Sequence, residues 1–219
     1  MEALVLIGIA AGVVALIWYH SEEKTLKRRL KNAPTFSLHE LPEAREARVI
    51  GQAQVLREHM RGPLSGRPCL GYIARVEQHR TNGRTSYWRT IISEARVVPF
   101  VLLDGTGRAI IDGAGAKLTL DFDSKSSSGT LDDPTEAERA FLARHRQQGK
   151  GLIFNKTLRY REAIIGVGET VAVLGTAVRE PDPNAAPADY RGAQPTLVRL
   201  TSSPKYPLVI CDDPATTRR

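Results

Sequence analysis

Cysteine is the residue in this chain with the widest range of chemistry, and there are only two, Cys69 and Cys211. Cys69 lies in the stretch SGRPCLGYIARVEQ (65–78), which enters a predicted strand. A catalytic thiolate needs a base, and the nearest candidate, His79, lies at the far, solvated end of a predicted hairpin. We therefore expect Cys69 to be a small apolar residue and predict no catalytic residue. A single disulfide between Cys69 and Cys211 stays open as an alternative, although a reducing cytoplasm disfavours it.

Other sequence patterns of enzymes and metal sites are missing. No Walker loop, Rossmann glycine pattern, HExxH or GxSxG is found, and the glycines of LDGTGRAII and IIGVGETV open strands, not helices. No histidine pairs with a cysteine at zinc-ligand spacing. The sequence thus predicts neither a metal nor a cofactor. The histidines are His20, His39, His59, His79 and His145.

A few polar and aromatic residues could take part in binding. Glu162 in YREAII could be a buried functional acid, but a surface or arginine-paired carboxylate is favoured. Asp104 is best explained as a turn former. The rings of Tyr72, Tyr87 and Trp88 could stack nucleic-acid bases on a barrel face, whereas their alternating positions favour the core or a cross-strand pair. Nucleic-acid binding is therefore the weaker alternative.

The N-terminus carries an apolar run, ALVLIGIAAGVVALIWY (3–19), which is about the minimum length for a membrane-spanning helix. It lacks the basic residues and the small-x-small site of a cleaved signal peptide. The pattern predicts an uncleaved transmembrane anchor in residues 1–20. Five cations follow it, and because positive flanks stay inside, a single-pass membrane protein with a cytoplasmic β domain is expected. We expect these cations to contact anionic headgroups: Lys24, Lys27, Arg28, Arg29 and Lys31.

The rest of the chain has the texture of strands separated by turns. Asn82-Gly83 and Asp104 to Gly107 join apolar or alternating runs at hairpin spacing. One helix interrupts them, beginning near Asp133 and Pro134. The predicted fold class is mainly β, antiparallel and barrel-like, with one inserted helix and the N-terminal transmembrane helix. The expected domains are the anchor (1–20), a basic juxtamembrane helix and linker (21–47), a β domain (48–211) with a Pro/Ala-rich loop (181–195), and a tail (212–219).

Three stretches, SGRPCLGYIARVEQ, WRTIISEARVVPFVLLDGTGRAIID and LRYREAIIGVGETVAVLGTAVRE, together resemble the GIDE or beside-a-membrane (BAM) domain of the mitochondrial ubiquitin ligase activator family. The resemblance covers about residues 48–180. It implies a β-rich domain, which in the family accompanies a C-terminal RING finger that carries ubiquitin-ligase chemistry. The matching motif positions are Pro68, Cys69, Trp88, Phe100, Asp104, Gly107, Glu162, Gly168 and Glu169.

The chain also departs from that family. A RING needs eight Cys or His ligands, and only Cys211 follows residue 180, so the chain looks like a RING-less, prokaryote-like member. The leading hypothesis is a membrane-anchored, non-enzymatic docking or sensing module beside the bilayer, with headgroups and an unknown protein as partners. The alternatives are ubiquitin-ligase-related activity implied by the family, and nucleic-acid binding by a face similar to that of oligonucleotide-binding (OB) barrels.

Overall fold

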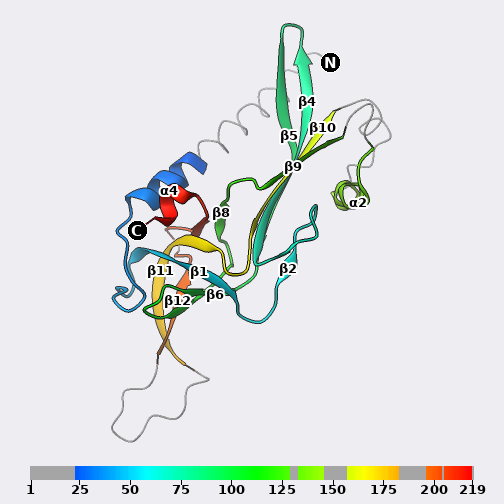
Figure 1. The fold of residues 1–219 in the computed structure, drawn as a ribbon. Helices are drawn as coiled ribbons and strands as arrows, with labels where there is room; N and C mark the ends of the chain where they lie inside the picture. The colour runs from blue at the N-terminus through cyan, green and yellow to red at the C-terminus, as the bar shows by residue number, and fades with distance from the viewer. Residues whose placement is uncertain (1–22, 129–132, 146–156, 183–195, 204, 219) are drawn as a thin grey trace, which may run out of the picture.

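The computed structural model describes residues 23–128, 133–145, 157–182, 196–203 and 205–218, which form two main sheets and few helices (Figure 1). The helices are residues 23–32, α2 (Glu136–Arg144) and α4 (Pro214–Thr217). The strands are β1 (Glu46–Val55), β2 (Met60–Arg61), β3 (Pro68–Cys69), β4 (Gly71–Asn82), β5 (Thr85–Val97), β6 (Phe100–Leu103), β7 (Arg108–Ile111), β8 (Lys117–Thr119), β9 (Ser124–Ser128), β10 (Leu158–Ile165), β11 (Thr170–Pro181), β12 (Thr196–Thr201) and β13 (Val209–Cys211).

Five strands close into a barrel in the order β1-β6-β7-β12-β11, with β11 pairing back onto β1. All these pairings are antiparallel except that of β7 with β12. Numbered 1 to 5 along the chain, the barrel strands follow the order 1-2-3-5-4-1, which is the order of an OB barrel. A second parallel pair, β8 with β13, extends the sheet beyond β11.

Alternation along the strands fills the barrel. In β6, Phe100 and Leu102 are buried while Val101 and Leu103 face outward, and β7 repeats the pattern. The loop after residue 33 adds Leu38 and Leu41 to the same core. Closure leaves no open edge among the five strands, which protects the barrel from edge-to-edge association.

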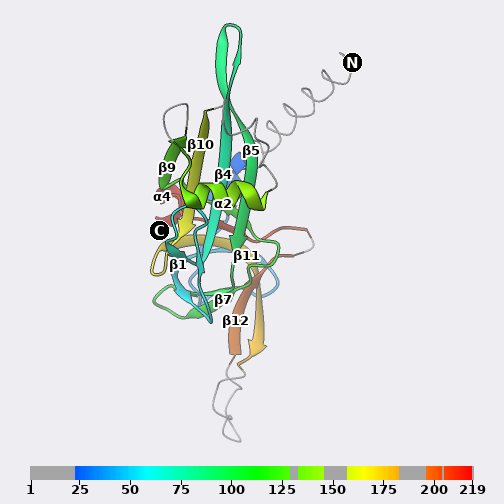
Figure 2. The same cartoon turned by 90° about the vertical axis from the view of Figure 1, so that its right-hand side faces the viewer.

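The second sheet, in the order β5-β4-β10-β9, grows out of two barrel connections. Its β4–β5 hairpin lies between the first and second barrel strands, and β9, α2 and β10 lie between the third and fourth. Near the barrel, Ile73, Ala163 and Ile165 of this sheet join the barrel core. Farther out, the hairpin extends away from the rest of the molecule (Figures 1 and 2).

Helix α2 covers one side of the second sheet, as Figure 2 shows. Phe141 and Leu142 are its buried apolar residues. Its N-cap is Thr135, whose hydroxyl accepts from the Glu138 N–H while the Glu138 carboxylate accepts from the Thr135 N–H. The start predicted at Asp133 and Pro134 is therefore two residues too early, because the true capping box begins at the threonine.

The helix of residues 23–32 packs on the outside of the barrel. Leu26 and Leu30 contact the outward residues of β11 and β13, including Leu174 and Val209. No helix in the described residues is long and apolar enough to cross a membrane. The anchor predicted in residues 1–20 lies outside the described residues.

This finding corrects two predictions. The described residues are mainly β, with a closed five-stranded barrel and few helices. The transmembrane helix in the predicted fold class has no counterpart among them. The localisation built on that helix, a single-pass membrane protein with a cytoplasmic β domain, is corrected with it.

Candidate functional site

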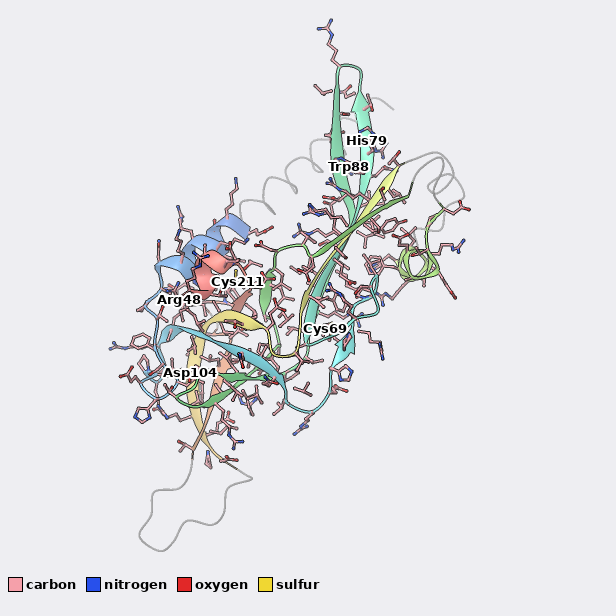
Figure 3. The ribbon with its side chains drawn as sticks, viewed as in Figure 1. Arg48, Cys69, His79, Trp88, Asp104 and Cys211 are labelled. Carbon is pink, nitrogen blue, oxygen red and sulfur yellow. The ribbon has the colours of Figure 1, made fainter. Side chains whose placement is uncertain are left out.

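Cys69 is fully buried in β3, among the apolar residues that α2 covers (Figure 3). Burial raises the pKa of its thiol to about 11, and the nearby Glu162 carboxylate adds to the effect. A thiol with so high a pKa is mostly protonated at neutral pH, and the thiolate is the nucleophilic form of cysteine. Cys211 is buried in a different cluster, beneath the helix of residues 23–32, and both cysteines are free. The disulfide left open by the sequence does not form.

Asp104 and Gly107 build the turn between β6 and β7. One Asp104 carboxylate oxygen accepts from the N–H groups of Thr106 and Gly107, at 2.8 and 3.0 Å, and the other accepts from the Leu38 N–H at 2.7 Å. Burial alone would raise the pKa of Asp104, but these donors lower it. Asp104 therefore fixes both its own turn and the loop that precedes β1.

Glu162 has a similar structural task. Its carboxylate is buried and accepts from the backbone N–H groups of Leu64 and Ser65, at 2.8 and 3.1 Å, so it anchors the loop between β2 and β3. A side chain on Gly62 would collide with this carboxylate. The favoured prediction, a surface or arginine-paired acid, is wrong, because the partners of Glu162 are backbone amides.

The remaining motif positions also shape the backbone. Gly168 has a φ of 84°, in the left-handed region, and the Glu169 carboxylate accepts from the Gly166 N–H at 2.6 Å in the same turn. Phe100 fills the barrel core, and Pro68 pairs with β2. Of the motif residues, Trp88 is the one on the projecting hairpin.

The five cations predicted to contact headgroups divide into two groups. Lys27 binds Asp121 and Asp213, at 3.0 and 3.4 Å, and Arg29 binds Glu46, so both hold their helix to the β structure. The other three, on the opposite side of the helix, are exposed: Lys24, Arg28 and Lys31.

The outer part of the β4–β5 hairpin, residues 80–89, is here named the free hairpin. Strand β10 pairs with β4 only as far as Gln78, and one further backbone bond joins His79 to Thr157, so no third described strand supports the ribbon beyond them. The free hairpin turns at Gly83, whose φ is 59°. It contains three arginines and no acid, and its Tyr87 is 51% exposed. A two-stranded ribbon of this kind adds little stability by itself, because isolated hairpins are only marginally stable.

The side of the second sheet opposite α2 is lined by charge, and we name it the cationic face: Lys125, Arg161, Arg75, Arg159 and Glu77. Arg159 donates to Glu77 at 2.7 Å, and its guanidinium lies 4.4 Å from the centre of the Trp88 ring. Arg161 and Arg75 lie 4.0 and 4.8 Å from the Phe122 ring centre. Trp88 also meets His79 edge to face, at 5.1 Å (Figure 3). Cations and aromatic rings thus alternate from the sheet to the base of the free hairpin.

The comparison with family models matches residues 72–189 to the family described as "GIDE: E3 Ubiquitin ligase". The match covers more than half of the chain. The chain belongs to the GIDE family. No curated protein and no solved structure matches it.

The residues that match the GIDE model include most of the second sheet and the free hairpin. The match begins inside β4 and runs through β11, so it contains the free hairpin and α2. Pro68 and Cys69 precede it, while the other seven motif positions fall within it. The sequence resemblance to this family is confirmed.

The side of the second sheet that α2 covers is here named the packed side. It holds a polar network that the sequence did not predict. The Glu94 carboxylate accepts from the Tyr72 hydroxyl and from Arg144 at 3.1 Å, and lies 2.7 Å from His145 Nε2. Burial alone would raise the pKa of Glu94, but these partners and Arg96 lower it. These four residues are spread over 74 positions and share no sequence motif, so only the fold brings them together.

The sequence suggested that three aromatic rings could stack nucleic-acid bases on a barrel face, but the structure places these rings elsewhere. Tyr72 is buried against α2, and Tyr87 and Trp88 lie on the hairpin, away from the barrel. The outward residues of β6 and β7 include Leu103 and Arg108, and Arg108 pairs with Asp182 at 2.7 Å. The rings invoked for base stacking are therefore not on the barrel.

Proposed function

We propose that this GIDE chain is a non-enzymatic docking module whose free hairpin binds an acidic segment of a partner protein. The observation that carries the proposal is the free hairpin itself: Arg80, Arg84 and Arg89 project from a ribbon with no acidic residue. These arginines are exposed, and none forms an ion pair with a carboxylate of the described residues. Arginine is suited to bidentate recognition of carboxylates, so the complementary partner is acidic.

A protein is favoured as the partner because the family is described as an E3 ubiquitin ligase, a class that acts on proteins. A non-enzymatic role is favoured by the state of Cys69, which is buried with a pKa of about 11.

The docking proposal is tested with the full chain and a fluorescent acidic peptide rich in glutamate. The variant R80Q/R84Q/R89Q should bind the peptide at least tenfold more weakly than the unaltered chain. The matched control, R45Q/R57Q/R139Q, removes three exposed arginines elsewhere and should bind normally. Equal loss in both variants would show nonspecific attraction and overturn the proposal. So would a failure of the unaltered chain to bind the peptide while it binds anionic vesicles or single-stranded RNA.

The non-enzymatic part needs its own experiment. The full chain is incubated with ubiquitin, ATP, an activating enzyme and a panel of conjugating enzymes. Ubiquitin chains should not form above the level without this chain. Chain formation that requires it would show ligase activity and would overturn the non-enzymatic role, whatever the result with the peptide.

A further inference from the structure

Three cations occupy one row across three adjacent strands of the second sheet. Lys125 of β9 lies directly opposite Arg161 of β10, and Arg161 lies directly opposite Arg75 of β4. Directly paired residues point to the same face of a sheet. All three side chains therefore emerge on the cationic face, next to one another.

This row is unfavourable for the fold alone, because like charges directly opposite each other destabilise a sheet. Two carboxylates of the described residues approach it. Glu77 lies 4.0 Å from Arg161 but is held by Arg159 at 2.7 Å, and Glu23 lies 3.6 Å from Arg75. With the Arg75–Glu23 pair left aside, three cations, Lys125, Arg161 and Arg159, face one carboxylate of the described residues, that of Glu77, which leaves a surplus of two positive charges.

The centre of the row is partly withdrawn from water. The Arg161 side chain is 24% exposed, and its Nε is buried without a hydrogen-bond partner among the described residues. Burial lowers the pKa of the Arg161 guanidinium, Glu77 opposes this, and Arg159 and Arg75 lower it further. Burial of the charged Arg161 guanidinium therefore costs free energy, which its contacts with the other described residues only partly offset.

We propose that the cationic face binds a phosphate dianion, free or as a monoester, with Arg161 at its centre. The surplus of two positive charges matches the charge of the dianion. Arg161 and Arg159 supply planar donors that match phosphate oxygens, and exposed Lys125 supplies a third cation at the rim. Ser127, directly opposite Arg159, adds a hydroxyl donor on the same face.

This site is separate from the docking function proposed for the free hairpin and does not depend on it. If the site exists, one substitution should stabilise the free protein and yet weaken phosphate binding. Lys125→Gln removes one of two like charges that lie opposite each other, so it should raise the thermal midpoint without phosphate and abolish the additional rise that phosphate gives. A purely structural lysine would show the opposite sign, a lowered midpoint with the phosphate response retained.

Binding is measured by titrating the full chain at pH 7.5 with inorganic phosphate and, separately, with O-phosphoserine, against sodium chloride of equal ionic strength. In ¹H–¹⁵N NMR spectra, the Arg161 Nε–H signal should shift with phosphate and not with chloride. Arg161→Gln and Lys125→Gln should each weaken binding at least tenfold, and the surface control Arg139→Gln should not. Tighter binding of O-phosphoserine than of phosphate would identify the monoester as the source.

Equal shifts with chloride and phosphate, or unchanged phosphate binding in Lys125→Gln, would overturn the inference. Because Arg161→Gln also removes a ring contact, Lys125→Gln keeps the test valid if that variant misfolds. The variant R80Q/R84Q/R89Q should retain phosphate binding, and Lys125→Gln should retain binding of the acidic peptide. The two proposals can therefore fail independently.

Discussion

The two sides of the second sheet are made by the same four strands, yet they are opposite in chemistry. On the packed side, Tyr72, Tyr160 and Ile164 meet Phe141 of α2 in a buried apolar cluster. On the cationic face, which alternate residues of the same strands form, Arg75 and Arg161 lie opposite each other. A period of two along each strand is enough to separate the sheet into these two surfaces.

The difference indicates where stability resides and where binding takes place. Burial of apolar area is the main favourable term in folding, so the packed side holds α2 and the sheet together. The cationic face instead has opposed like charges, and the free hairpin beyond it has no third described strand. Our two proposals therefore place recognition at the opposed cations and at the free hairpin. Mutations on the packed side should therefore lower the stability of the fold, whereas mutations on the cationic face and the free hairpin should mainly weaken binding.

The largest effect is expected for Phe141→Ala on the packed side. Phe141 is almost fully buried, and truncation of such a side chain typically costs about 3–5 kcal/mol of the free energy of unfolding. Urea unfolding followed by circular dichroism measures the loss. The control Ala140→Gly changes an exposed position on the same helix and should cost about 1 kcal/mol. A loss below about 1 kcal/mol for Phe141→Ala would show that α2 does not depend on this packing.

Much of this architecture follows from local sequence, for physical reasons. Asn82-Gly83 and the Asp104 to Gly107 turn form because nearby residues satisfy the turn geometry, so both hairpins can be predicted from short stretches. Alternation likewise predicts which residues of β6 face the core. The cap of α2 shows the limit, since both Asp133 and Thr135 are good caps and only the structure selects the second.

What the sequence could not predict depends on pairing between distant strands. The parallel contact of β7 with β12 joins residues about ninety positions apart, and it turns a series of strands into a barrel of OB order. The row on the cationic face needs the registers of β9, β10 and β4 together, and a shift of one residue would separate Lys125 from Arg161. The row of cations could therefore not be predicted from sequence motifs, which indicated turn residues such as Asp104 instead.

Glu162→Gln should have the next largest effect. The carboxylate accepts two backbone hydrogen bonds in a buried setting, and hydrogen bonds to charged groups contribute about 1.5–3 kcal/mol each. The amide can still accept one bond but turns donors toward the Ser65 N–H, so a loss of about 2 kcal/mol is expected. Calorimetric unfolding measures it, and faster hydrogen exchange at Leu64 and Ser65 would locate it. Unchanged exchange at both amides would contradict this role.

Glu94→Gln tests the polar network of the packed side through pH. Because the folded protein lowers the pKa of Glu94 below its ordinary 4.5, the carboxylate stabilises the fold above that pH, and this contribution disappears as the pH falls through the lowered value. At pH 7 the variant should be less stable by about 1–2 kcal/mol. The gap between variant and unaltered chain should narrow toward pH 3, as measured by urea midpoints. A gap that stays constant with pH would mean that the charge of Glu94 is not what holds α2.

A smaller effect than these three is expected for Trp88→Ala, at the base of the free hairpin. Trp88 is large, but it is only half-buried and contacts Arg159 and His79 in place of an apolar core. Loss of a cation–π contact of this kind costs about 0.5–1 kcal/mol, well below the cost for Phe141. The more exposed Tyr87→Ala should cost less than about 0.5 kcal/mol. If Trp88→Ala destabilised the chain as much as Phe141→Ala, the hairpin would be part of the folding core, and its cations could no longer be attributed to recognition alone.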